Sequence, residues 1–177
     1  RVDDEWTMRL GDVGQSNRRG RAPSRPIPGS DERAGAPYYD RALENETRRL
    51  DALLDYARDQ AELQTREYGL RFTRNGYSFI ALDARTGAWL EVNDEVLRAR
   101  TLPEGLELDL VLEGKKIVLD RTTKPEALTP HVGVASTGDF SSFEVTLRRA
   151  GGLPRQTIKT REDGTLEVGE LVETGAG

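Results

Sequence analysis

The sequence predicts an α+β protein in which one long helix near the N-terminus is followed by about eight short antiparallel strands. Between about Tyr39 and Tyr68, apolar residues recur at spacings of three and four, as on one face of a helix. From Gly69 onward, apolar residues alternate with a period of two, and turn sequences divide this region into short segments. Because such a helix must bury its apolar face, we expect it to pack on two small sheets or on one strongly curved sheet.

The predicted helix, residues 39–68, has an apolar stripe and a charged opposite face. The stripe consists of Leu43, Leu50, Leu54, Ala57 and Ala61, is continued by Thr47, Gln64 and Tyr68, and is widened by Leu53, Tyr56 and Leu63. Asp40 suits the N-cap position, and Gly69 suits the position just past the C-terminal end. On the opposite face some charged pairs attract and others repel. We therefore expect this face to be mainly solvated.

The first 37 residues differ from the rest of the chain in composition. Residues 6–13 alternate like one strand, and the stretch after them is rich in Arg, Pro, Gly and Ser, with almost nothing to bury. We predict that residues 1–37 are a flexible N-terminal extension, or an appended peptide with its linker. The basic cluster at residues 18–21 is better interpreted as a solvated charge run than as a nucleic-acid contact. Residues 38–177 then form the folded domain, with strands over about 69–170.

The strand region opens with its clearest local signal. Two alternating segments flank Asn75-Gly76, a pair typical of hairpin turns, so residues 69–83 are predicted to form a β-hairpin. The next strand contains Trp89, which we expect in the core. Leucines at alternate positions within 106–112 predict a strand with one buried face. Further strands are predicted at 116–120, 131–136, 143–148, 156–160 and 165–169, with glycine-containing turns between most of them.

Composition and charge exclude several classes of function. The formal net charge is -5 and the sequence pI is about 5.1, which indicates neither a nucleic-acid partner nor an anionic membrane surface. No cysteine is present, so disulfides, thiolate catalysis and sulfur-based zinc sites are excluded. The sequence contains no long apolar run and no visible signal peptide, and we expect the chain as given to be soluble.

No motif in the sequence indicates catalysis. His131 is the single histidine and heads an apolar strand, so we interpret it as a structural residue and expect no Ser-His-Asp triad. The carboxylates fall on turns and outer faces, and no phosphate-binding, calcium-binding or zinc motif occurs. We predict no enzymatic activity, no cofactor and no catalytic residue, while a metal site made of carboxylates alone stays open. A hydrolase or sugar-binding β domain is an alternative, which would require Trp89 and Tyr77 to be exposed on one face.

Three stretches of the chain resemble one known family. They are the helix running directly into the strand at residues 70–72, the hairpin NGYSFIALDARTGAWLEV, and the segment VGVASTGDFSSFEVTL. In the last segment, the residues that match the family pattern are Ser136, Thr137, Gly138, Asp139, Phe140 and Phe143. With these stretches in this order, the chain resembles the soluble part of the GspH-type minor pseudopilins of the type II secretion system, which share a domain family with the FimT minor pilins.

The resemblance implies a pilin-like fold and a non-enzymatic, structural role in the periplasmic pseudopilus, near its tip, where the subunit assists export of folded proteins across the outer membrane. It implies other pseudopilins as partners, both the major pseudopilin and the minor pseudopilins of the tip, and no nucleic acid. Native members begin with an apolar segment that anchors them in the inner membrane. Residues 1–37 occupy that place here, so we expect the periplasmic domain of an inner-membrane-anchored protein without its anchor helix.

Pilin-like subunits stack helix against helix, so the resemblance points to the charged face of the predicted helix. We predict a subunit interface at Arg48, Asp55, Arg58, Asp59 and Glu62, where complementary charge would set register and partner choice more than affinity. The alternative function is that of a FimT-like type IV minor pilin that binds DNA or assists pilus assembly. DNA binding would need a basic groove or tail, whereas residues 162–173 are predominantly acidic.

Overall fold

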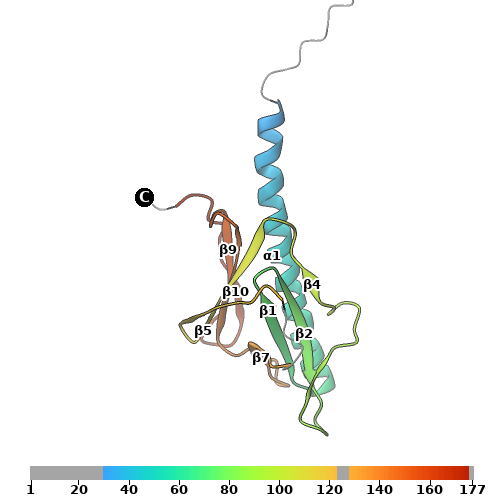
Figure 1. Cartoon of the computed structure of the whole chain (residues 1–177). Helices are drawn as coiled ribbons and strands as arrows, with labels where there is room; N and C mark the ends of the chain where they lie inside the picture. The colour runs from blue at the N-terminus through green and yellow to red at the C-terminus, as the bar shows by residue number, and fades with distance from the viewer. Residues whose placement is uncertain (1–29, 123–127, 176–177) are drawn as a thin grey trace, which may run out of the picture. The chain divides into compact units, whose positions relative to one another are not determined.

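The computed structural model describes residues 30–122 and 128–175 (Figure 1). Ala34–Gly177 form one compact unit, to which the description below refers. Arg1–Arg33 form a separate unit, of which only the first turn of the helix is described. The predicted strand at residues 6–13, the predicted linker up to Gly29 and residues 123–127 of a polar loop lie outside the described residues.

One α-helix and ten β-strands make up the described part of the chain. The elements are α1 (Ser30–Gln64), β1 (Tyr68–Thr73), β2 (Gly76–Leu82), β3 (Trp89–Glu91), β4 (Arg100–Thr101), β5 (Leu106–Leu112), β6 (Lys115–Ile117), β7 (Val132–Val134), β8 (Phe143–Arg149), β9 (Arg155–Thr160) and β10 (Leu166–Val168). This order confirms the predicted α+β class. The two-residue β4 is the strand that had no signal in the sequence.

The strands form two five-stranded antiparallel sheets. The first sheet has the order β3-β2-β1-β7, with β4 paired to β2 beyond one end of β3. The second sheet has the order β10-β9-β8-β5-β6. Figure 1 shows β1 and β2 running alongside the C-terminal half of α1. Of the two arrangements left open by the sequence, two sheets is the one observed.

The helix begins earlier than predicted. α1 starts at Ser30, so the predicted linker residues 30–37 are helical, and Asp40, the predicted N-cap, lies inside the helix. The predicted end at Tyr68 is also wrong, because α1 ends at Gln64 and Tyr68 begins β1. The prediction of this end relied on hydrophobic spacing alone. Tyr68 is buried as part of β1, and only by coincidence does it also match the helical spacing of the apolar stripe.

The chain leaves the helix through a threonine. Thr65 has a left-handed backbone with φ 48°. The Arg66 N–H donates to the Ala61 carbonyl (3.0 Å) and the Thr65 N–H to the Glu62 carbonyl (3.3 Å), which is the Schellman pattern of hydrogen bonds. Glycine usually takes this position, and the prediction had reserved Gly69 for it. Gly69 instead lies in β1.

Close packing explains the glycine in β1. A Cβ added to Gly69 would lie 2.5 Å from Cβ of Pro130 and 3.3 Å from Cγ1 of Ile80. Gly69 pairs with Gly133 of β7, and the space that a side chain on Gly69 would need is filled by Pro130 and Ile80. The small residue therefore permits close approach within the sheet and does not terminate the helix.

The apolar stripe of α1 is largely confirmed. Its five principal residues are fully buried: Leu43, Leu50, Leu54, Ala57 and Ala61. Thr47 is buried as well, and its hydroxyl donates to the Leu43 carbonyl at 2.9 Å, which satisfies the polar group inside the core. Leu53 and Tyr56 widen the stripe as predicted, but Leu63 does not, because its side chain is 78% exposed. Gln64 is exposed too.

The β1–β2 hairpin forms where predicted, with the turn shifted by one residue. Thr73 pairs with Gly76, so Arg74 and Asn75 are the loop residues and Gly76 is the first residue of β2. A Cβ on Gly76 would lie 2.5 Å from the Arg100 carbonyl oxygen, so β4 packs against this position. The glycine is thus needed for the approach of a neighbouring strand.

The same turn joins the two sheets through main-chain atoms. The Arg74 N–H donates to the Asp120 carbonyl at 2.8 Å, and the Leu108 N–H donates to the Arg74 carbonyl at 2.7 Å. Leu108 belongs to β5 in the second sheet, and Asp120 follows β6. The hairpin tip is therefore held between the second sheet and the segment after it.

A single hydrophobic core connects α1 with both sheets. The second sheet contributes one face of β5, β8 and β9, namely Leu106, Leu108, Leu110, Phe143, Val145, Leu147 and Ile158. Trp89, predicted in the core, is only half-buried. Trp89 pairs with Leu82 on the face of the first sheet opposite to Tyr77, and Tyr77 is the residue that faces α1. The strand at Trp89 was predicted correctly, but the burial of Trp89 in the core was not.

Candidate functional site

The residues predicted as a subunit interface lie along the polar surface of α1. Arg48, Asp59 and Glu62 are exposed, and Asp55 and Arg58 are partly buried. Arg58 Nη2 lies 2.9 Å from Asp55 Oδ1, whereas Arg48 Nη2 is 4.0 Å from Glu44 Oε2. Both ion pairs are local to the helix and solvent-screened, so each contributes little to stability. Their charges remain available for recognition.

A neighbouring carboxylate extends this charged row. Asp51 is partly buried, and burial is the main cause that raises its pKa above the usual value. The charge of Asp55 raises the pKa further, while Arg58 acts in the opposite direction. The three residues therefore form a coupled group on one side of α1, in which Arg58 is the only cation.

The family-motif residues form a tight turn that packs against the end of this row. Gly138 is buried and has a left-handed backbone, φ 87°. A Cβ added to Gly138 would overlap the Glu62 carboxylate and would lie 3.1 Å from Arg58 Cγ. Only glycine combines this backbone conformation with so close an approach to the helix. The motif glycine and two of the predicted interface residues therefore meet at one place.

The turn is held by its own hydrogen bonds. The Ala135 N–H donates to the Asp139 carbonyl and the Gly138 N–H to the Ala135 carbonyl, each at 2.9 Å. The Thr137 hydroxyl donates to the Asp139 carboxylate at 2.9 Å. Asp139 Oδ1 also lies 3.2 Å from where a Cβ on Gly164 would be, so the turn reaches the β9–β10 connection as well. These bonds make the turn a preformed surface beside α1.

The remaining motif residues are structural in their placement. Phe140 and Phe143 are buried, and their ring centroids are 6.1 Å apart. Val134 and Phe140 form an isolated bridge that closes the turn. Ser136 is partly buried and Thr137 exposed. The aromatic pair thus anchors the turn in the core, and its polar residues face outward.

We call Arg58, Glu62, Gly138 and Asp139 the helix–turn junction. Asp55 joins it through its ion pair with Arg58. Arg48 lies outside it, because ten residues of α-helix separate it from Arg58, a rise of about 15 Å. The structure therefore brings together the C-terminal part of the predicted interface and two of the six motif residues, and leaves Arg48 apart.

His131 has a structural hydrogen bond, as its position in the sequence predicted. Its ring Nδ1 accepts from the Phe72 main-chain N–H at 2.9 Å. The main-chain N–H of His131 donates to the Leu70 carbonyl at 2.8 Å, so the residue extends the pairing of β7 with β1. Burial, assisted by the positive charge of Arg71, lowers the pKa of His131. In the described ranges, no group of three or more acidic or histidine side chains is arranged to hold a metal ion. Among the same residues, no helix is long and apolar enough to cross a membrane.

Sequence reasoning missed a buried carboxylate on the apolar side of α1. Glu46 is only 2% exposed. It accepts from the Tyr77 hydroxyl at 3.0 Å and pairs with Arg49 at 2.8 Å. Burial first, and then the charge and hydrogen bond of Glu46, raise the pKa of Tyr77. Glu46 stands three residues after Leu43 and four before Leu50, so the helical period places it on the buried face. The prediction overlooked this spacing.

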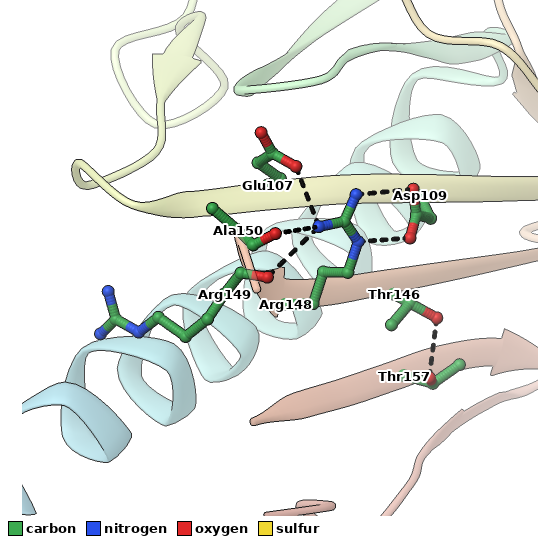
Figure 2. A network of polar contacts seen from close by, with 7 residues as sticks. All are labelled: Glu107, Asp109, Thr146, Arg148, Arg149, Ala150 and Thr157. Atoms are coloured by element: carbon green, nitrogen blue, oxygen red, sulfur yellow. Dashed lines mark hydrogen bonds and ion pairs between the residues drawn. The ribbon is translucent and has the colours of Figure 1, made fainter. Parts of the chain in front are cut away.

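A second missed cluster lies on the outer face of the second sheet (Figure 2). Arg148 Nε lies 2.6 Å from Asp109 Oδ2, Nη2 lies 3.3 Å from Oδ1, and Nη1 lies 2.9 Å from Glu107 Oε2. The hydrogen bond from Arg148 is the main cause that lowers the pKa of Asp109. This cluster depends on the register of β5 with β8, which periodicity cannot supply.

Comparisons with known proteins agree on one family. A family model described as Type II transport protein GspH matches residues 46–164. The type II secretion system protein H of Pseudomonas aeruginosa is 34% identical over 116 residues, which cover 63% of this chain and 66% of that protein. The protein of the same name from Aeromonas hydrophila is 29% identical over 143 residues, 76% of this chain and 78% of that one.

Solved structures support the same fold. A crystal structure of the minor pseudopilin EpsH from the type II secretion system of Vibrio cholerae matches with TM-score 0.62 at 23% identity, covering 72% of this chain and 95% of that one. The solution structure of Escherichia coli GspH matches with TM-score 0.54 at 18% identity, covering 83% and 96%. At these identities the likeness establishes a pilin-like fold and no more.

Proposed function

The chain belongs to the GspH family of type II transport proteins, and from this premise we propose that it acts as a non-enzymatic structural subunit, a minor pseudopilin of the type II secretion pseudopilus. We assign this role to residues 38–177, in the periplasm, as a subunit that assists export of folded proteins across the outer membrane. Its proposed partners are the major pseudopilin and the other minor pseudopilins.

The observation that carries the proposal is the charged surface of α1 beside a preformed turn. Asp59 is exposed, and no hydrogen bond or ion pair to it is found within the described residues. Glu62 is exposed although it contacts Gly138. A surface of this kind suits recognition by a helix of opposite charge pattern, since rim charges set register and association rate at little cost to folding.

The test is a binding titration of the full chain against the soluble domains of the other pseudopilins of the same system, followed by NMR. Asp59→Lys should weaken binding by about threefold to tenfold and leave the free energy of unfolding within about 0.5 kcal/mol. Arg58 is a poorer choice for substitution, because its stem also supports the Gly138 turn. Shifts should concentrate at the helix–turn junction.

Glu104→Lys is the matched control, because it makes the same charge change in an exposed turn before β5. If both reversals weaken binding equally, net charge and not the α1 surface governs the association. Duplex DNA serves as the parallel ligand. Saturable DNA binding with a steep salt dependence, and none to pseudopilin domains, would replace this proposal with the FimT-like alternative.

A further inference from the structure

The edge of the first sheet is interrupted between β3 and β4. β3 pairs with β2 as far as Ile80, and β4 resumes the pairing at Tyr77. Only Ser78 and Phe79 of β2 lie between these two pairings, whereas residues 92–99 of the edge segment join β3 to β4. We call residues 92–99 the strap. Because the strap is much longer than this gap requires, it leaves the sheet edge.

The strap reaches α1 and the core. The Tyr56 hydroxyl on α1 donates to Asp94 Oδ2 at 3.0 Å, and the Val96 N–H donates to Asp94 Oδ1 at 2.7 Å. The Leu97 side chain is 1% exposed and belongs to the hydrophobic core. One carboxylate therefore connects the main chain of the strap to the helix, and one leucine anchors the strap in the core.

Few other contacts hold the strap. Within the described residues, no hydrogen bond between main-chain atoms joins the strap to α1 or to a strand. The bond from Arg100 Nη2 to the Val96 carbonyl is long, 3.4 Å. Five strap residues are exposed: Asn93, Glu95, Val96, Arg98 and Ala99. A segment with a single fully buried side chain and a main chain without ladder bonds is expected to have low local stability.

The second sheet is held more firmly than the strap. β5 pairs with β8 along its whole length, from Leu106 to Leu112, and Leu110 and Val145 in this ladder are fully buried. Ladder bonds and buried apolar contacts of this kind break only in openings of high free energy. The contacts of the strap can therefore be lost while the sheets stay intact.

We infer that the strap opens and closes as a conformational unit while both sheets stay folded, and that the hydrogen bond from Tyr56 to Asp94 holds it closed. The inference goes beyond the proposed role in the pseudopilus and does not depend on it.

Opening takes Leu97 out of the core and frees the edge of β2 at Ser78 and Phe79. Among the described residues, this stretch has no strand partner on that side. Unpaired main-chain groups at a sheet edge are a template for association with another chain. The closed strap therefore protects this edge, and α1 makes the polar contact that keeps it closed.

The test is amide hydrogen exchange of the full chain, followed by NMR. We expect the Val96 N–H to be protected, but to exchange at least about a hundredfold faster than the slowest amides of β5 and β8, because only the strap has to open. Tyr56→Phe removes the hydroxyl that holds Asp94, and it should speed exchange at Val96 by about threefold to tenfold. Cleavage by trypsin after Arg98 is the second readout and should accelerate by a similar factor.

Val145→Ala is the control, because Val145 is fully buried in β8, which stays folded when the strap opens. This variant should speed exchange of the slowest β5 and β8 amides by at least about tenfold and leave both strap readouts unchanged. If exchange at Val96 accelerates as much as in β8, the strap opens only with the whole domain and the inference is wrong. It is also wrong if Tyr56→Phe leaves both strap readouts unchanged, or if Val96 is unprotected in the unchanged protein.

Discussion

The outer faces of the two sheets use charge in different ways. On the second sheet, Arg148 is held by Glu107 and Asp109, and Glu167 lies 3.8 Å from Lys159 and 3.5 Å from Arg161. These charges pair across neighbouring strands. The outer face of the first sheet carries Arg71 and Ser78 beside a groove near the β1–β2 turn, which Arg121 and one carboxylate, Glu91, also line. We conclude that the second sheet pairs its outer charges between its own strands, whereas the groove of the first sheet has an exposed arginine, Arg121, at its rim.

The inner faces show the reverse order. Along β5 and β8 the second sheet presents apolar residues to the core, with Arg149 at the end of β8 as the exception, whereas the first sheet meets α1 through the buried hydrogen bond between Tyr77 and Glu46. A buried charge is costly unless every partner is in place. The first sheet is therefore the more sensitive of the two to loss of one polar contact with the helix.

Removing the hydroxyl that meets the buried carboxylate should have the largest effect. Tyr77→Phe leaves Glu46 Oε1 without its donor, and we expect a loss of about 2–3 kcal/mol in the free energy of unfolding, measured by urea denaturation. In a Glu46→Gln background the same substitution should cost less, because a neutral amide is buried instead of a charge. A cost below about 0.5 kcal/mol in the otherwise unchanged protein would contradict the contrast between the inner faces.

The next test concerns the turn that follows β7. Gly138→Ala forces a left-handed alanine against Glu62 and Arg58, and we expect a loss of about 2 kcal/mol. Gly87→Ala is the control, since Gly87 also has a positive φ, 69°, but no atom within 4 Å of an added Cβ. The control should show the backbone strain alone, about 1 kcal/mol. Equal losses would mean that the helix contact contributes nothing.

Breaking the clamp on the second sheet, which is the set of ion pairs of Arg148 with Glu107 and Asp109, should cost less free energy of unfolding. Arg148→Met removes the ion pairs with Glu107 and Asp109 at a partly exposed site, and we expect about 1 kcal/mol, decreasing as salt is added. Because Arg148 lowers the pKa of Asp109, the clamp stabilises the fold fully above the ordinary aspartate pKa, near 3.8, and this contribution is lost as pH falls below it. Acid denaturation of the variant should therefore begin from a lower stability and show a weaker pH dependence. If the variant lost stability with falling pH as steeply as the unchanged protein, Arg148 would not contribute to the pH dependence.

The smallest effect is expected from histidine protonation in the first sheet. The pKa of His131 is lowered in the folded protein, so the unfolded chain binds the proton first as pH falls below about 6.5. Stability should be constant above pH 7 and should decrease modestly toward pH 5, because protonation removes the acceptor of the Phe72 N–H. His131→Asn should flatten this dependence in thermal melts, and a dependence that persists would have to come from another group.

The sequence predicted what depends on periodicity. The stripe of α1, the β1–β2 hairpin and the alternation of β5 all follow from local spacing, and the structure confirms them. Leu63 shows where spacing misleads, because it was placed on the stripe by its helical spacing but is 78% exposed. Trp89 shows the second limit. Alternation tells which residues share a face but not which face is inward when a strand lies at a sheet edge.

The candidate site was predictable only in parts. Both the charged face of α1 and the motif around Gly138 were visible in the sequence, but their contact joins residues about 76 apart in sequence and requires the tertiary fold. The groove at the first sheet could not be foreseen, because Arg71, Thr101 and Arg121 come from three separate segments. Their arrangement follows from the pairing of β4 with β2, and β4 is too short to produce a pattern.

The joint between the sheets, which is the pair of main-chain hydrogen bonds at Arg74, affects which substitutions this turn can tolerate. Its two bonds use the N–H groups of Arg74 and Leu108 and the carbonyl groups of Asp120 and Arg74, and no side chain. Nineteen of the twenty amino acids carry the same donor, so substitutions at Arg74 preserve the joint unless the new residue is proline. The side chain at position 74 can therefore change without loss of the two main-chain bonds that connect the β1–β2 turn to β5 and to the segment after β6.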